Sequence, residues 1–196
     1  YRHLRGVVRR ELDRRDSVRR ADWSLDHENV AHQEFGDERA ACFVGRDDLL
    51  DEIEIYLRGN QTTPLVFIGP GGCGKTALLA RAAQRAIAEQ PPATVRHVIT
   101  RYIGATSISS DWRQLLEDLC RQIYRVCRLD DQLQRRLAEV AEDDTSAAGS
   151  DQRLKVRSQY RIEGDAPALQ LKLNFFLQQV PPAEQLVIVL DALDQF

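Results

Sequence analysis

The sequence of 196 residues contains no methionine, and its 27 basic residues include only three lysines, Lys75, Lys155 and Lys172. Without methionine the chain has no initiator residue, so we expect it to be a piece of a longer polypeptide. Arginine in such excess over lysine, together with abundant alanine, is typical of a GC-rich coding sequence. On this basis we expect a bacterial source.

Three further absences narrow the class of protein. No apolar run reaches the roughly 18 residues that a membrane helix needs, so no membrane span is expected. The four cysteines form no CxxC or Cys/His metal spacing, so we interpret them as free thiols of a reducing, cytoplasmic compartment. Cys120 and Cys127 lie two helical turns apart, about 10 Å along the axis, which indicates core packing rather than a shared metal ion.

A strong positive charge is also missing. The net charge is −3, which argues against a general nucleic-acid binder. Residues 1–20 contain eight arginines, but acidic residues are mixed among them and apolar residues recur at helical spacing. We therefore interpret this segment as the solvated face of a helix rather than as an arm that binds nucleic acid.

The most informative segment runs from Leu65 to Thr76, where an apolar run predicted to be a strand is followed by a glycine-rich turn. The spacing of Gly69, Gly74, Lys75 and Thr76 is that of a phosphate-binding loop. Glycines let backbone N–H groups turn toward phosphate oxygens, and the helix that follows directs its positive end at the anion. We expect Lys75 to contact the β- and γ-phosphates as a catalytic residue, and Thr76 to ligate Mg²⁺. The nucleotide-binding residues predicted on this loop are Gly69, Pro70, Gly71, Gly72, Cys73, Gly74, Lys75, Thr76 and Ala77.

A second informative segment, which is acidic, lies near the C-terminal end of the sequence. Residues 186–190 form a β-branched apolar run, typical of a strand buried on both faces, and this run leads into Asp191 and Asp194. A carboxylate at the end of a buried strand beside a phosphate loop is a usual Mg²⁺ ligand, so we assign Asp191 to the metal. Asp194 is the candidate for polarising the attacking water. The alternative is that both acids only end the strand in solvent.

Strands alternate with helices along the chain, which predicts an α/β fold. The predicted strands cover residues 65–68, 95–103 and 186–190, and residues 143–165 read as a polar excursion or loop. We expect a P-loop NTPase fold, with a parallel sheet covered by helices on both faces and a helical linker at the N-terminus. Residues 1–40 are the expected linker after an absent N-terminal domain, and residues 41–196 the N-terminal part of an incomplete ATPase domain.

Several short motifs resemble those of STAND-class ATPases, with an AAA-like or NACHT-like domain of the nephrocystin and WD-repeat type. Phe43-Val-Gly-Arg46, about twenty residues before the loop, resembles the family's entry motif. The resemblance implies that Val44 and Gly45 lie near the adenine and Arg46 near the nucleotide. Residues 101–111, 190–194 and 28–39 resemble, respectively, the segment after the second strand, the second acidic motif and the helical linker. Gln195 stands where the family often has glutamate, which implies slow turnover.

The resemblance implies a regulatory switch that binds ATP or ADP with Mg²⁺ and hydrolyses ATP slowly, within a larger signalling or defence protein. Protein partners would bind through absent flanking domains, and the nucleotide state would control an oligomer. Three alternatives stay open. One is a DNA-associated AAA ATPase of the initiation type, which the arginine-rich start favours and the overall acidity disfavours. The others are a P-loop phosphotransferase and an interaction module with an inactive loop, the last disfavoured by the intact Lys75, Thr76 and Asp191. The entry motif is the only reason to prefer adenine over guanine.

Overall fold

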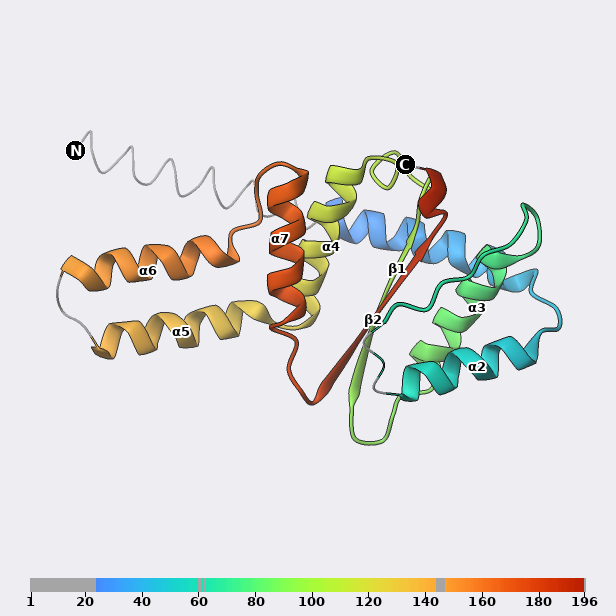
Figure 1. Cartoon of the computed structure of the whole chain (residues 1–196), viewed down its shortest axis with the longest axis horizontal. Helices are drawn as coiled ribbons and strands as arrows, with labels where there is room; N and C mark the ends of the chain where they lie inside the picture. Colours follow the sequence, from blue (N-terminus) through green and yellow to red (C-terminus); the bar gives the residue numbers. More distant parts are fainter. Residues whose placement is uncertain (1–23, 60, 62, 144–146, 196) are drawn as a thin grey trace.

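The structure is a computed structural model that describes residues 24–59, 61, 63–143 and 147–195 (Figure 1). The predicted helix over residues 1–20 lies outside these ranges. Two parallel strands form the sheet, β1 (Val95–Tyr102) and β2 (Glu184–Asp191). Their register places Val95 opposite Glu184 and Tyr102 opposite Asp191. The shared C-terminal edge of the two strands therefore ends at a carboxylate.

Parallel neighbours require a crossover connection, and here it contains four helices among its described residues. The chain passes from β1 through α4 (Trp112–Val126), α5 (Leu129–Asp143), α6 (Ala147–Tyr160) and α7 (Ala166–Leu177) before it enters β2. Asp111 caps α4 by accepting from the Gln114 N–H, and Asp165 caps α7 by accepting from the Ala168 N–H.

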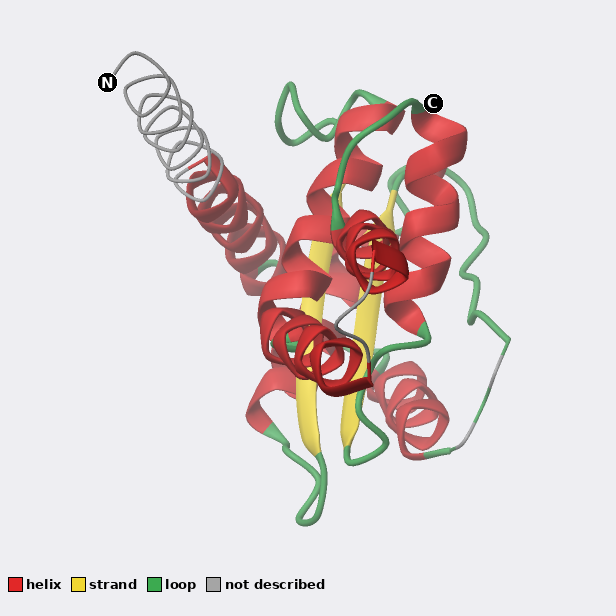
Figure 2. Cartoon of the chain, turned by 90° about the vertical axis from the view of Figure 1, so that its left-hand side faces the viewer, coloured by secondary structure: helices red, strands yellow, loops and turns green. Residues whose placement is uncertain are grey.

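Helices cover both faces of the sheet, as the sequence predicts (Figure 2). On one face, α4 and α7 pack with Ile99 of β1 into the largest core cluster, around Phe176, Ile123 and Leu119. The buried thiols of Cys120 and Cys127 belong to the same cluster, which confirms their predicted packing role. Burial raises the pKa of Cys120 to about 12 and that of Cys127 to about 11, so both thiols stay protonated.

On the other face, α3 (Lys75–Ala88) contacts both strands and α2 (Asp47–Arg58) packs against α3. Leu50 and Ile53 of α2 meet Leu78 and Ala82 of α3 in a second core cluster. The helix that starts at the phosphate loop is therefore fixed directly on the sheet. None of the helices in the described part of the chain is long and apolar enough to cross a membrane.

Residues 65–68 do not form the predicted strand. Two of their side chains are largely exposed, Val66 at 69% and Ile68 at 94%. A strand needs a neighbour to complete its backbone hydrogen bonds, and an apolar cavity of about 640 Å³ lies between this segment and β2. The local sequence has strand propensity, but within the described residues no adjacent strand pairs with it.

Residues 147–160 also differ from the prediction, because they form helix α6 rather than a loop. The helix packs beside α5, and Tyr160 at its end is buried against Phe175 and Phe176. Most of the described α6 side chains are exposed, and Lys155 pairs with Asp151 at 2.8 Å. A helix without an apolar stripe gives no periodic signal, which is why the sequence indicated a loop.

A helix over residues 24–41, here called the edge helix, runs across the strand direction near the C-terminal end of β1 (Figure 1). Asn29 accepts from Arg101, whose guanidinium also binds Asp118 at 2.6 Å. His32 accepts the backbone N–H of Tyr102 at its Nδ1 atom, and its Nε2 atom lies 3.1 Å from Glu28. Side chains of one helix thereby cover the C-terminal end of the edge strand β1.

Burial of His32 predicts a loss of stability in acid. The pKa of His32 is lowered from 6.5 to about 4, first by burial and then by the charge of Arg101. Because the folded pKa lies below the unfolded one, neutral His32 contributes to the free energy of unfolding. This contribution is fully present above pH 6.5 and is lost as the pH falls toward 4. It amounts to about 3 kcal/mol.

Urea unfolding between pH 7 and pH 4 measures this effect, with His32→Asn as the control because asparagine does not titrate. We expect the wild type to lose about 3 kcal/mol more than the control over this range. Equal losses in the two proteins would contradict the prediction.

Candidate nucleotide-binding site

The glycine-rich turn leads into α3 through left-handed backbone at two glycines. Gly72 has φ of 75° and Gly74 has φ of 86°, values that residues with a Cβ rarely adopt. Gly74 is the N-terminal flanking residue of α3, and its carbonyl accepts from the Leu78 N–H at 2.9 Å. A Cβ at Gly71 or Gly72 would meet nothing within 4 Å, so open space lies beside the loop where phosphate oxygens would sit.

Lys75 folds back over its own loop. Its ammonium donates to the carbonyl of Gly69 at 2.8 Å and to that of Pro70 at 3.0 Å. The Sγ atom of Cys73 lies 3.9 Å from the same nitrogen. The charge of Lys75 is thus already held at the loop, and an incoming phosphate would compete with two carbonyl groups for it.

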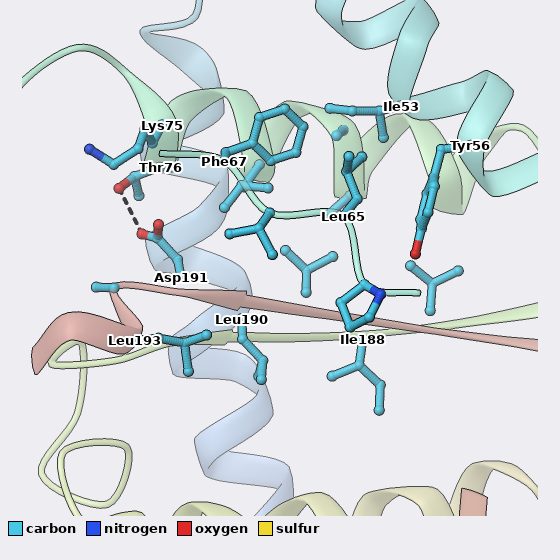
Figure 3. Close-up of a pocket in the computed structure, with 18 of the residues that line it drawn as sticks. Ile53, Tyr56, Leu65, Phe67, Lys75, Thr76, Ile188, Leu190, Asp191 and Leu193 are labelled. Carbon is cyan, nitrogen blue, oxygen red and sulfur yellow. Dashed lines mark hydrogen bonds between the residues drawn. The ribbon is translucent and has the colours of Figure 1, made fainter. Parts of the chain in front are cut away.

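Thr76 and Asp191 are joined across 115 residues of sequence. The Thr76 hydroxyl, at the first turn of α3, donates to the Asp191 carboxylate at 2.7 Å (Figure 3). Asp191 is buried at the last position of β2, so the sheet fixes one partner and the phosphate-loop helix fixes the other. The contact confirms the expectation that the acidic strand end lies beside the loop.

Two oxygen groups at this distance fit a Mg²⁺ ion. Mg²⁺ prefers hard oxygen ligands and usually keeps several waters, binding one or two protein groups plus substrate phosphates. The pair therefore suits a metal that arrives with a nucleotide.

Asp194 is placed differently from Asp191. Ala192 adopts left-handed backbone with φ of 61°, which turns the chain immediately after β2 into the short 3-10 helix Leu193–Gln195. Asp194 is exposed there, yet it lines the same cavity as Lys75, Thr76 and Asp191. The local sequence gives no sign of this turn, because alanine rarely takes positive φ.

The cavity of about 640 Å³ has a polar end and an apolar end (Figure 3). Lys75, Thr76 and Asp191 gather at the polar end, where the phosphates and the metal would bind. Residues 64–68, β2 and the α2 residues Ile53 and Tyr56 line the rest. This contribution of α2 was not predicted, because apolar side chains at helical spacing are typical of ordinary core packing.

The residues of the entry motif lie mostly apart from the cavity. Val44 is 90% exposed, and neither it nor Gly45 lines the cavity. Arg46, which has left-handed backbone at the start of α2, reaches the loop: its Nη1 atom lies 3.8 Å from the position that a Cβ on Gly74 would occupy. The structure thus brings Arg46 to the phosphate loop but leaves Val44 in solvent.

We expect Arg46→Ala to weaken ADP binding about 3- to 5-fold, because an exposed charge pair contributes at most ~1 kcal/mol. Isothermal titration calorimetry provides the measurement. Arg58→Ala is the matched control, since Arg58 is an exposed arginine in the last turn of the same helix. If both variants bind ADP as the wild type does, Arg46 has only a structural role.

The site and the α/β fold define a P-loop NTPase. Comparison with known protein families supports this assignment: residues 42–196 match the family described as AAA ATPase domain. The chain belongs to that family, and its phosphate loop is accordingly that of a nucleotide-binding ATPase domain.

Two curated relatives share part of the sequence. An 87-residue segment is 40% identical to human NACHT domain- and WD repeat-containing protein 1, covering 41% of this chain and 5% of that protein. The mouse protein of the same name is 36% identical over 92 residues, which cover 44% of this chain and 6% of the relative. The chain thus aligns with only about one-twentieth of each relative. No solved structure matches it significantly. Both relatives are mammalian, and the bacterial source stays a prediction.

Proposed function

We propose that this chain is the ATP- and ADP-binding part of a regulatory switch that requires Mg²⁺ and hydrolyses ATP slowly. The observation that supports it best is the 2.7 Å contact between Thr76 and Asp191. That contact places a hydroxyl and a carboxylate, both Mg²⁺ ligands by type, beside a glycine loop with a lysine. We further propose that Lys75 stabilises the phosphates and that Asp194 orients the attacking water.

The wider protein is proposed to be a STAND-type signalling or defence protein of the cytoplasm. Support comes from the curated relatives, whose names combine a NACHT domain with WD repeats. In this proposal residues 1–40 connect the ATPase domain to a preceding domain, and protein partners bind through flanking domains. Nucleotide exchange would shift the chain between two packing states and control an oligomer. The same names are the reason to prefer this function over DNA-associated or phosphotransferase alternatives.

Substitution of Thr76 tests the metal-dependent part of the proposal. Thr76→Val keeps the side-chain shape and removes the hydroxyl, whereas Thr76→Ser keeps the hydroxyl. We expect Thr76→Val to bind ATP equally with Mg²⁺ and with EDTA, because the metal has lost a ligand, while Thr76→Ser retains most of the Mg²⁺ effect. Titration calorimetry under both conditions measures this. Retention of the full Mg²⁺ effect by Thr76→Val would exclude the hydroxyl as a ligand.

A further inference from the structure

The edge helix contacts α3, which holds Thr76, and β1, which is the strand paired with the one that holds Asp191. On the β1 side, His32 binds the backbone of Tyr102, the residue opposite Asp191 in the sheet register. On the α3 side, Asp37 accepts from the Gln84 amide at 2.6 Å. These contacts place one helix against the phosphate-loop helix and against the strand next to Asp191.

His32 is held in a defined tautomer. The Tyr102 N–H can only donate, so Nδ1 of His32 must accept and the ring proton sits on Nε2, which donates to Glu28. Glu28 also accepts from the Thr106 hydroxyl, and the His32 side chain is fully buried. The ring thus joins the edge helix to the end of β1 and to the loop that follows it.

Tyr102 transmits this contact toward Asp191. Ile103, the next residue, donates its N–H to the Asp191 carbonyl at 3.2 Å, so the two strand ends are tied where the metal carboxylate projects. The pKa of Tyr102 is raised to about 12, first by burial and then by the negative charges of Asp191 and Asp37. The negative charge of Asp191, which a bound metal would neutralise, therefore acts on the buried phenol of Tyr102.

Tyr102 also touches the phosphate-loop helix. It forms a small buried cluster with Ala40 of the edge helix and Ala80 of α3. Ala80 lies four residues after Thr76, which puts both on one face of α3, one turn apart. The packing is close, since a Cβ on Gly36 of the edge helix would lie 2.7 Å from the Tyr102 hydroxyl.

We propose that the edge helix is energetically coupled to the magnesium side of the site, and that His32 is the positioning residue which, through Tyr102, fixes the Asp191 end of β2. The inference rests on the proposed function and adds its regulation. Coupling between two sites is reciprocal, so docking of the edge helix strengthens Mg²⁺-dependent binding, and Mg²⁺-nucleotide strengthens docking of the helix. This gives the nucleotide state a physical route to the sequence before residue 24.

Two substitutions separate this role from simple packing. In His32→Asn the amide oxygen stands near the position of Nδ1 and can accept from Tyr102, while the bond to Glu28 is lost. In His32→Gln the amide reaches Glu28 instead, and Tyr102 loses its partner. ADP affinity is measured for both variants and the wild type, with excess Mg²⁺ and with EDTA.

We expect His32→Gln to lose about 5-fold or more of the affinity gained from Mg²⁺, with affinity in EDTA unchanged, and His32→Asn to keep the gain. Hydrogen exchange of residues 24–41 is expected to slow more with Mg²⁺ and ADP than with ADP in EDTA. A Mg²⁺ gain equal to that of the wild type in His32→Gln, or equal losses in both variants under both conditions, would overturn the coupling.

Gly36→Ala provides a second variant in case His32→Gln does not fold, because alanine favours the helix while its Cβ displaces Tyr102. It is expected to reduce the Mg²⁺ gain as well, and an unchanged gain would also contradict the proposal. The two levels of inference can be distinguished. If the wild type binds no ADP under either condition, the proposed function fails. If it binds and Mg²⁺ acts equally in all variants, only the coupling fails.

Discussion

Lys75→Ala is expected to lower the affinity for Mg²⁺-ATP about 10- to 100-fold. The ammonium is held at the loop by the carbonyls of Gly69 and Pro70, where it would meet the phosphates. A charge-assisted hydrogen bond to a phosphate contributes about 1.5–3 kcal/mol, which sets the size of the loss. Titration calorimetry with Mg²⁺-ATP provides the measurement.

Lys155→Ala is the matched control for this experiment. Lys155 is an exposed lysine on α6, paired with Asp151 and outside the cavity, so its removal should leave ATP affinity unchanged. Urea unfolding of both variants shows whether Lys75→Ala merely loosens the loop that its side chain holds. Equal ATP affinity in the wild type and in a folded Lys75→Ala would rule out the phosphate-loop assignment.

The second large effect separates the two carboxylates. Asp194→Asn should slow single-turnover ATP hydrolysis about 10²- to 10⁴-fold while ATP affinity stays nearly intact. A water-orienting group acts mainly in the transition state, so its loss appears in the rate rather than in binding. The exposed position of Asp194 at the cavity supports this role.

Asp191→Asn should instead weaken Mg²⁺-dependent ATP binding, since Asp191 contacts Thr76 and has the buried position of a metal ligand. Each variant serves as the control for the other, because both exchange one carboxylate for an amide within four residues. The reverse pattern, with binding lost in Asp194→Asn and unaffected in Asp191→Asn, would show that the roles are exchanged. Because Gln195 stands where glutamate is frequent in the family, we expect slow turnover, and the assay therefore follows a single turnover.

Much of the site was accessible from local sequence. The glycine spacing before Lys75 and Thr76 predicts a loop that only glycines can form, and the structure has left-handed backbone at Gly72 and Gly74. Apolar runs of strand-forming residues predicted β1 and β2. These features depend on steric preference and periodicity over a few residues, which a sequence displays directly.

Other features depend on contacts between distant segments, and only the tertiary structure decided them. Residues 65–68 have strand propensity, but no strand among the described residues pairs with them. Helix α6 forms without an apolar stripe because it packs against α5 and is anchored by Tyr160. The contact between Thr76 and Asp191 spans 115 residues. The link from His32 to Tyr102 spans 70. Pairing across such separations is set by how helices and strands pack, and the sequence by itself determined the chemistry of the loop but not these partners.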